Sequence, residues 1–178
     1  MQKKRLLSLL VPALILFAPA ARAEQPRLIA TYQKWSVYSF TEDGKKVCYM
    51  ASQPEKMEGA SAKTHRGEVF ALITNRPAEG SKNVFSYITG YTYKPGSGVT
   101  AAVDQQHFTL FTQDDTAWAP DGVTDNKIAA ALRKGKTMVV KGTSAKGTET
   151  TDTFNLAGSG GAYTALAKAC GADSKAAH

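Results

Sequence analysis

Short segments rich in valine, threonine and aromatic residues recur along most of this chain, with turn-forming residues between them. They span residues 33–40, 46–52, 68–74, 83–93, 98–104, 107–112, 116–119, 136–144 and 149–158. β-Branched and aromatic residues favour strands, whereas glycine, proline, aspartate and asparagine favour turns. Residues 54–64 are small and polar, which favours a long loop. Because no helix alternates with the strands, the pattern predicts a mainly β fold, an antiparallel β-sandwich.

Two further segments have a helical pattern. In residues 123–135, Thr124 is placed to cap the amino end, Val123 can pack against Ile128, and a glycine ends the segment. The second segment, residues 162–170, ends at a cysteine. The expected sandwich therefore carries two short helices, one of them C-terminal.

The glycines that precede the second helix could belong to a phosphate-binding loop or to a simple turn. Gly158 and Gly160 occupy the first two glycine positions of the dinucleotide motif G-x-G-x-x-G, but Tyr163 stands at the third. No strand follows the helix to complete a βαβ unit. We therefore expect a turn into a short helix whose Tyr163, Leu166 and Cys170 share one face.

The amino end has the features of a secretory signal peptide. A basic start precedes an apolar run of about 13 residues, shorter than the ~20 that a membrane-spanning helix needs. Small residues then mark a cleavage site between Ala23 and Glu24. We expect residues 1–23 to be removed and residues 24–178 to form one mature domain without a transmembrane segment.

The mature chain has two cysteines, Cys48 and Cys170. Exported proteins meet oxidising conditions, so an intramolecular disulfide is the expected state. Such a bond would stabilise the fold by roughly 4 to 5 kcal/mol in the chain-entropy model. Free thiols and an intermolecular bridge are the alternatives.

Charge and residue spacing give little support for nucleic-acid binding. The formal net charge is +7, and four basic residues lie in the first 23 residues, which leaves +3 for the rest. The remaining lysines and arginines are interspersed with acids, as on an ordinary solvated surface. We expect no nucleic-acid partner.

Residue types that perform catalysis or bind metals are dispersed. The three histidines, His65, His107 and His178, have no metal-ligand spacing, so no metal site and no cofactor are expected. Asp114 and Asp115 are adjacent, and neighbours on a strand point to opposite faces, so a turn suits them better than a catalytic pair. The sequence predicts no catalytic residue.

Three tyrosines, Tyr87, Tyr91 and Tyr93, lie in one segment. Tyrosine combines an apolar ring with a polar hydroxyl and is common at contact surfaces. The three residues are therefore the candidate binding face, although a place in the sandwich core and its rim is the alternative.

Several short motifs occur in an order that resembles a known family. They are Trp35-Ser36-Val37, Val47-Cys48-Tyr49-Met50-Ala51, Ile73-Thr74-Asn75-Arg76-Pro77, Gly90-Tyr91-Thr92-Tyr93, Ala117-Trp118-Ala119, Met138-Val139-Val140 and Phe154-Asn155-Leu156-Ala157-Gly158. Over residues 30–170 the chain resembles the invasion-associated locus B family, exported proteins of alphaproteobacteria. The resemblance implies an immunoglobulin-like β-sandwich, residence in the periplasm or outer envelope, and a link to virulence through host-cell invasion. Cys48 and Cys170 match cysteine positions of that family.

Three functional hypotheses follow. The first is an exported, non-enzymatic domain, periplasmic, associated with the outer envelope or secreted, that binds a protein or a cell-envelope component. The second is a periplasmic binder of a small molecule or cell-wall ligand, which the loop at 54–64 would serve. The third, a hydrolase, rests on exposed aspartates and His107 alone.

Overall fold

The computed structural model describes residues 24–59 and 66–171. The strands are β1 (Arg27–Tyr32), β2 (Trp35–Glu42), β3 (Lys45–Ser52), β4 (Lys56–Glu58), β5 (Phe70–Arg76), β6 (Ser81–Ile88), β7 (Val99–Val103), β8 (Gln106–Gln113), β9 (Thr116–Trp118), β10 (Thr137–Thr143) and β11 (Glu149–Asn155). The helices are α1 (Gly122–Lys134) and α2 (Ser159–Cys170), with a short 3-10 turn at Pro77–Glu79. The signal-peptide prediction, His65 and His178 fall outside the described residues.

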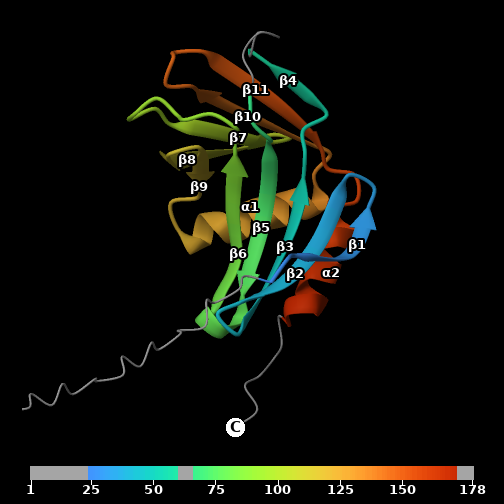
Figure 1. The fold of residues 1–178 in the computed structure, drawn as a ribbon. Helices are drawn as coiled ribbons and strands as arrows, with labels where there is room; N and C mark the ends of the chain where they lie inside the picture. The colour runs from blue at the N-terminus through green and yellow to red at the C-terminus, as the bar shows by residue number, and fades with distance from the viewer. Residues whose placement is uncertain (1–23, 60–65, 172–178) are drawn as a thin grey trace, which may run out of the picture.

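Within the described residues, all strands join one antiparallel sheet in the order β1-β2-β3-β5-β6-β9-β8-β7-β10-β11-β4. Strand β8 changes partner along its length, because residues 106–110 pair with β7 and residues 111–113 pair with β9. The sheet bends there into a long half (β1, β2, β3, β5, β6 and β9) and a short half (β7, β10, β11 and β4), which cross in Figure 1.

The mainly β, antiparallel fold with two helices is confirmed. One difference from an immunoglobulin-like sandwich is that the two layers are not separate sheets. They are the two halves of a single sheet, since β8 takes part in both.

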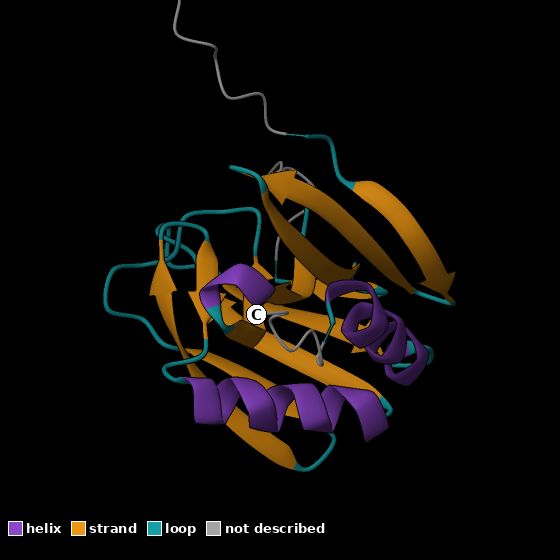
Figure 2. Cartoon of the chain, turned by 90° about the horizontal axis from the view of Figure 1, so that it is seen from below, coloured by secondary structure: helices purple, strands orange, loops and turns teal. Residues whose placement is uncertain are grey.

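The core lies between the inner faces of the two halves. Alternate residues of each strand face it, as in β5, where Ala71, Ile73 and Asn75 are buried and their neighbours are half-exposed. Both helices pack on this same side of the long half, where Ile128 of α1 and Leu166 of α2 join the core (Figure 2). In Figure 1 the helices lie behind the long half, and neither covers its opposite face.

Helix α1 begins earlier than its sequence pattern predicts. Asp121, not Thr124, is the cap, and its carboxylate accepts a hydrogen bond from the Thr124 N–H at 2.7 Å. Val123 is 64% exposed, so the expected packing of Val123 against the buried Ile128 is wrong. The Asp121 carboxylate therefore pairs with a free N–H group of the first helical turn, which is the role expected of Thr124.

Gly158 is the N-cap of α2, and Gly160 and Gly161 lie in its first turn, so the helix begins at Ser159 and not at residue 162. Gly158 has φ of 91°, and a Cβ there would lie 2.1 Å from the carbonyl oxygen of Tyr32. A Cβ at Gly161 would lie 2.7 Å from the Tyr32 ring. Close packing against β1 therefore explains these glycines. At the other end of α2, Cys170 forms a disulfide with Cys48 of β3, with a Cα–Cα distance of 5.7 Å.

Two strands lie where the sequence indicates none. β1 pairs with β2 at one edge of the sheet, and β4 pairs with β11 at the other edge. β4 lies inside residues 54–64, so the expected loop is partly strand; residues 60–64 are outside the described part of the chain.

Candidate functional site

The prediction that Tyr87, Tyr91 and Tyr93 form an exposed contact face is wrong, because these side chains are buried or half-buried. Tyr87 is 1% and Tyr93 is 3% exposed, and Tyr91 is half-buried against the core. Tyr87 lies within β6 and faces the core, whereas Tyr91 and Tyr93 are placed by the chain direction after β6. Gly90 turns the backbone at φ of 72°, so Tyr91 and Tyr93 do not continue the strand.

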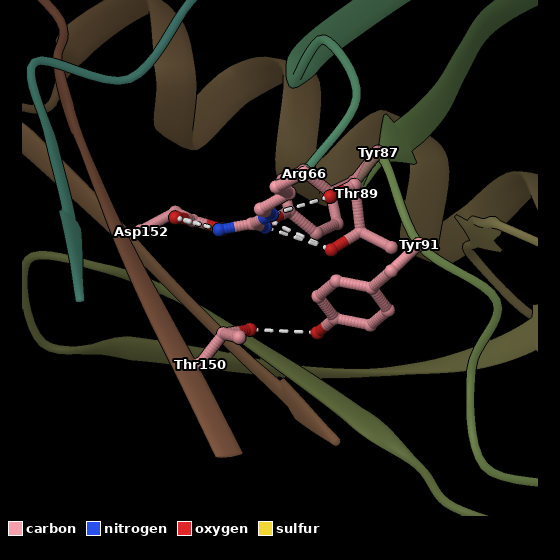
Figure 3. A network of polar contacts seen from close by, with 6 residues as sticks. All are labelled: Arg66, Tyr87, Thr89, Tyr91, Thr150 and Asp152. Carbon is pink, nitrogen blue, oxygen red and sulfur yellow. Dashed lines mark hydrogen bonds and ion pairs between the residues drawn. The ribbon is translucent and has the colours of Figure 1, made fainter. Parts of the chain in front are cut away.

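Tyr87 and Tyr91 lie beside the side chain of Arg66, as Figure 3 shows. The guanidinium donates to the two carboxylate oxygens of Asp152 at 2.8 and 2.5 Å and to the Tyr87 hydroxyl at 3.0 Å. It also donates to the carbonyl and hydroxyl oxygens of Thr89, at 2.6 and 2.8 Å. The Tyr87 hydroxyl in turn donates to Asp152.

The outer part of this network is aromatic. The Arg66 guanidinium lies 5.0 Å from the centre of the Tyr91 ring, a cation–π contact. The Tyr91 hydroxyl lies 2.6 Å from the Thr150 hydroxyl, which binds it to β11. The Tyr93 hydroxyl is buried and has no hydrogen-bond partner within the described residues.

Electrostatics in the network favour fixed protonation states. Burial, the charge of Asp152 and its hydrogen bond raise the pKa of Tyr87 far above its ordinary value. Burial lowers the pKa of Arg66, but the hydrogen bond and charge of Asp152 outweigh this effect and raise it overall. Neither group exchanges protons near neutral pH. The network therefore acts as an anchor that joins the segment before β5 to β6 and β11.

The opposite face of the long half is different, because many of its side chains are apolar and yet half-exposed. Cross-strand pairing places Tyr38 beside Tyr49 and Phe40 beside Val47. Similar side-by-side pairs continue across β5, β6 and β9. We call this surface the outer aromatic face; it comprises Leu28, Tyr38, Phe40, Tyr49, Phe70, Leu72, Val84, Ile88, Phe111 and Trp118.

The rings of the outer aromatic face contact one another. Tyr38 and Tyr49 stack with ring centres 5.0 Å apart, and Phe40 meets Tyr49 edge-on at 6.2 Å. Beside the stack runs an open groove of about 400 Å³. Its lining residues are Lys34, Ser36, Tyr38, Tyr49, Ala51, Ser52, Gln53, Phe70 and Leu72. Burial, with the coulombic effect of Tyr38 second, raises the pKa of Tyr49, so its hydroxyl stays protonated.

A signal for this face is present in the sequence. Trp35 and Val37 alternate with Tyr38 and Phe40, so a strand that buries the first pair presents the second pair on its other face. The signal is that aromatic residues occupy both sets of alternating positions in one strand, with Trp35 in one set and Tyr38 and Phe40 in the other. It is easily missed because a core requires apolar residues in only one of these two sets of positions.

The residues expected for a hydrolase do not meet. His107 is exposed on the outer face of the short half, and within the described residues no hydrogen bond or ion pair joins it to a carboxylate. Asp114 and Asp115 lie in the turn between β8 and β9, and Asp115 accepts a hydrogen bond from Thr116 at 3.0 Å. In the described part of the chain, no group of three potential metal ligands occurs. None of the helices described is long and apolar enough to cross a membrane.

Comparison with known proteins gives the family. A crystal structure of invasion associated protein b from Bartonella henselae has a similar fold, with a TM-score of 0.53 and 21% sequence identity over 79% of this chain and 95% of that chain. A comparison with curated protein sequences gave no match. The sequence model of the Invasion associated locus B (IalB) protein family matches residues 35–167. This chain therefore belongs to the invasion associated locus B family.

Proposed function

We propose that the protein is an exported, non-enzymatic binding module of the periplasm or outer envelope that binds an envelope component through its outer aromatic face. One observation carries the proposal: many half-exposed aromatic and aliphatic side chains lie on a sheet face that neither of the described helices covers. Contiguous apolar surface of this kind is typical of interaction sites in soluble domains. Aromatic residues are also enriched at the centres of interfaces.

Four charged side chains at the rim of this face give little support for a polyanionic partner. Arg76 forms an ion pair with Glu42, and Lys45 lies 4.0 Å from Glu79. These four charges are paired with one another, so they offer little to a polyanion such as nucleic acid.

The proposed location rests on three supports. The amino end has the pattern of a signal peptide, and the Cys48–Cys170 disulfide is typical of proteins outside the reducing cytoplasm. The similar Bartonella protein is named as invasion associated. Contact between the bacterial envelope and a host cell is one setting in which such a module would act.

Sedimentation with purified envelope fractions tests the proposal. We expect the mature protein to sediment with the fraction that holds its partner, and a Tyr38→Ser/Phe111→Ser variant to lose at least about tenfold in affinity. The matched control is Val139→Ser, which removes a half-exposed apolar side chain from the outer face of the short half. Equal sedimentation of both folded variants and the unchanged protein would contradict the proposal.

A further inference from the structure

The groove beside the tyrosine stack carries a single charge. Among its nine lining residues, Lys34 is the one charged side chain, and it is exposed. No ion pair to Lys34 occurs within the described residues. The groove therefore has a net positive charge that is not neutralised from within, and a ligand with one negative charge would complement it.

The backbone of Lys34 is held in place by a side-chain hydrogen bond. The Ser52 hydroxyl donates to the carbonyl oxygen of Lys34 at 2.8 Å, which connects the turn before β2 to the end of β3. The same hydroxyl also donates to the Gln53 carbonyl at 3.3 Å. Ser52 is therefore committed to holding the wall of the groove, and the Lys34 and Gln53 side chains stay available to a ligand.

The rest of the groove combines flat apolar surface with polar groups at its edge. The rings of Tyr38, Tyr49 and Phe70 supply the apolar surface, and Ser36 and Gln53 supply a hydroxyl and an amide. A pyranose ring has the complementary form, because its C–H bonds make an apolar face while its hydroxyl and acetamido groups project from the edge. Pockets that bind small ligands have a similar mixture of aromatic surface and a few polar groups.

We propose that this groove binds a sugar ring that bears a carboxylate, of the N-acetylmuramic acid type present in cell-wall glycan. The sugar stacks on the Tyr38–Tyr49 pair, and its carboxylate faces the Lys34 ammonium. This assignment rests on the proposed function, of which it names the ligand. An apolar protein segment would fit the rings but would leave Lys34 and Gln53 without partners, so it complements the groove less well.

Two disaccharides that differ in one carboxylate test the assignment. The probes are N-acetylglucosaminyl-N-acetylmuramic acid and neutral diacetylchitobiose, titrated into the mature protein by calorimetry at low salt. We expect the acidic sugar to bind about threefold to fivefold more tightly, as an exposed charge pair allows, and the preference to shrink as salt is added.

Matched variants locate the preference. Lys34→Gln should remove the preference for the acidic sugar while binding of the neutral sugar remains. Lys46→Gln, which removes an exposed lysine outside the groove, should keep the preference. Tyr38→Leu, which retains an apolar side chain without the ring, should weaken both sugars. Thermal melting confirms that each variant is folded.

Three results would overturn the assignment. Equal affinity of the unchanged protein for the two sugars, or a preference that survives Lys34→Gln, would exclude recognition of the carboxylate. Binding of neither sugar, while the protein still sediments with envelope membranes in a protease-sensitive manner, would identify a protein occupant and leave the proposed function standing. If the unchanged protein binds neither the sugars nor the envelope fractions, both proposals are contradicted.

Discussion

The outer faces of the two sheet halves have the same position in the fold but different chemistry. On the long half, many of the outward side chains are aromatic or aliphatic, with polar residues such as Thr74 and Ser86 among them. On the short half, register places Thr100 beside Thr109 and beside Lys141, and Lys141 beside Thr151. Both faces are open to solvent, and both belong to one continuous sheet.

This difference shows which side chains the fold requires and which it does not. An antiparallel sheet with one buried face needs apolar residues on that face alone. The short half folds in this way, with threonine and lysine side chains on its outer face. The rings of the outer aromatic face are therefore additional to folding. Their presence is explained better by contact with a ligand or partner than by stability.

The largest effect should come from the inner side, where Asp152 of the short half pairs with Arg66. Asp152→Asn should lower the free energy of unfolding by about 4 kcal/mol, because the buried guanidinium loses its charged partner. Thr151→Ala, one residue away and facing outward, is the control and should change it by less than about 0.5 kcal/mol. Denaturation in urea measures both. Similar values for the two variants would show that inner and outer positions do not differ as the structure indicates.

Removal of the disulfide should have the next largest effect. A Cys48→Ala/Cys170→Ala variant should be less stable by about 3 kcal/mol, because the unfolded chain gains freedom; residual structure in the unfolded chain keeps the loss below the full chain-entropy value. The disulfide lies in the long half, so amide exchange should accelerate in α2 and β3 before it accelerates in β10 and β11. Uniform acceleration across both halves would contradict this difference between them.

Substitution on the outer aromatic face should affect stability less. Phe111→Thr replaces a side chain that is 50% exposed, and we expect a change below about 1 kcal/mol in the free energy of unfolding. Thr109→Tyr adds a ring to the outer face of the short half and should not increase sedimentation with envelope fractions. A large loss of stability in the first variant would show that the rings serve folding after all.

The smallest effect should be a pH dependence at Asp125 on α1. Its carboxylate accepts a hydrogen bond from the Phe85 N–H at 2.8 Å, and burial, only partly opposed by that bond, raises the pKa of Asp125. A raised pKa means that the protonated form stabilises the fold in acid and that this stability is lost as pH rises through the raised pKa.

An Asp125→Asn variant isolates this contribution. It should match the unchanged protein near the ordinary carboxyl pKa of about 4 and become the more stable of the two, by less than about 1 kcal/mol, at neutral pH. Urea denaturation at several pH values measures the difference. A difference that stays constant with pH would exclude titration of Asp125 as its cause.

The sequence was informative where one local rule decided the structure. Alternation in β5 is an example, since strand parity is readable from neighbouring residues. The close packing of Gly158 and Gly161 is not, because both meet Tyr32 of β1, which is distant in the chain. β4 was not predictable in the same way, because its three exposed residues form a strand only by pairing with β11, about 95 positions away in the chain.

The candidate site was harder to predict than the fold. Tyr91 and Tyr93 look like the continuation of a strand, but Gly90 packs so closely on Gly67 that a Cβ would lie 2.4 Å from its carbonyl oxygen. That contact turns the chain inward and buries the tyrosines. Which face of β2 remains open depends on where the helices pack, and this is a property of the whole fold.

The link between Cys48 and Cys170 also determines how the protein responds to mechanical tension. Their separation of 122 positions encloses most of the sheet, from the middle of β3 to β11. If a force acts between residues before Cys48 and residues after Cys170, it passes through the sulfur–sulfur bond and bypasses the enclosed segment. Only β1, β2 and the first residues of β3 can then be drawn out. A module attached at one end and held at the other would keep most of its structure under load.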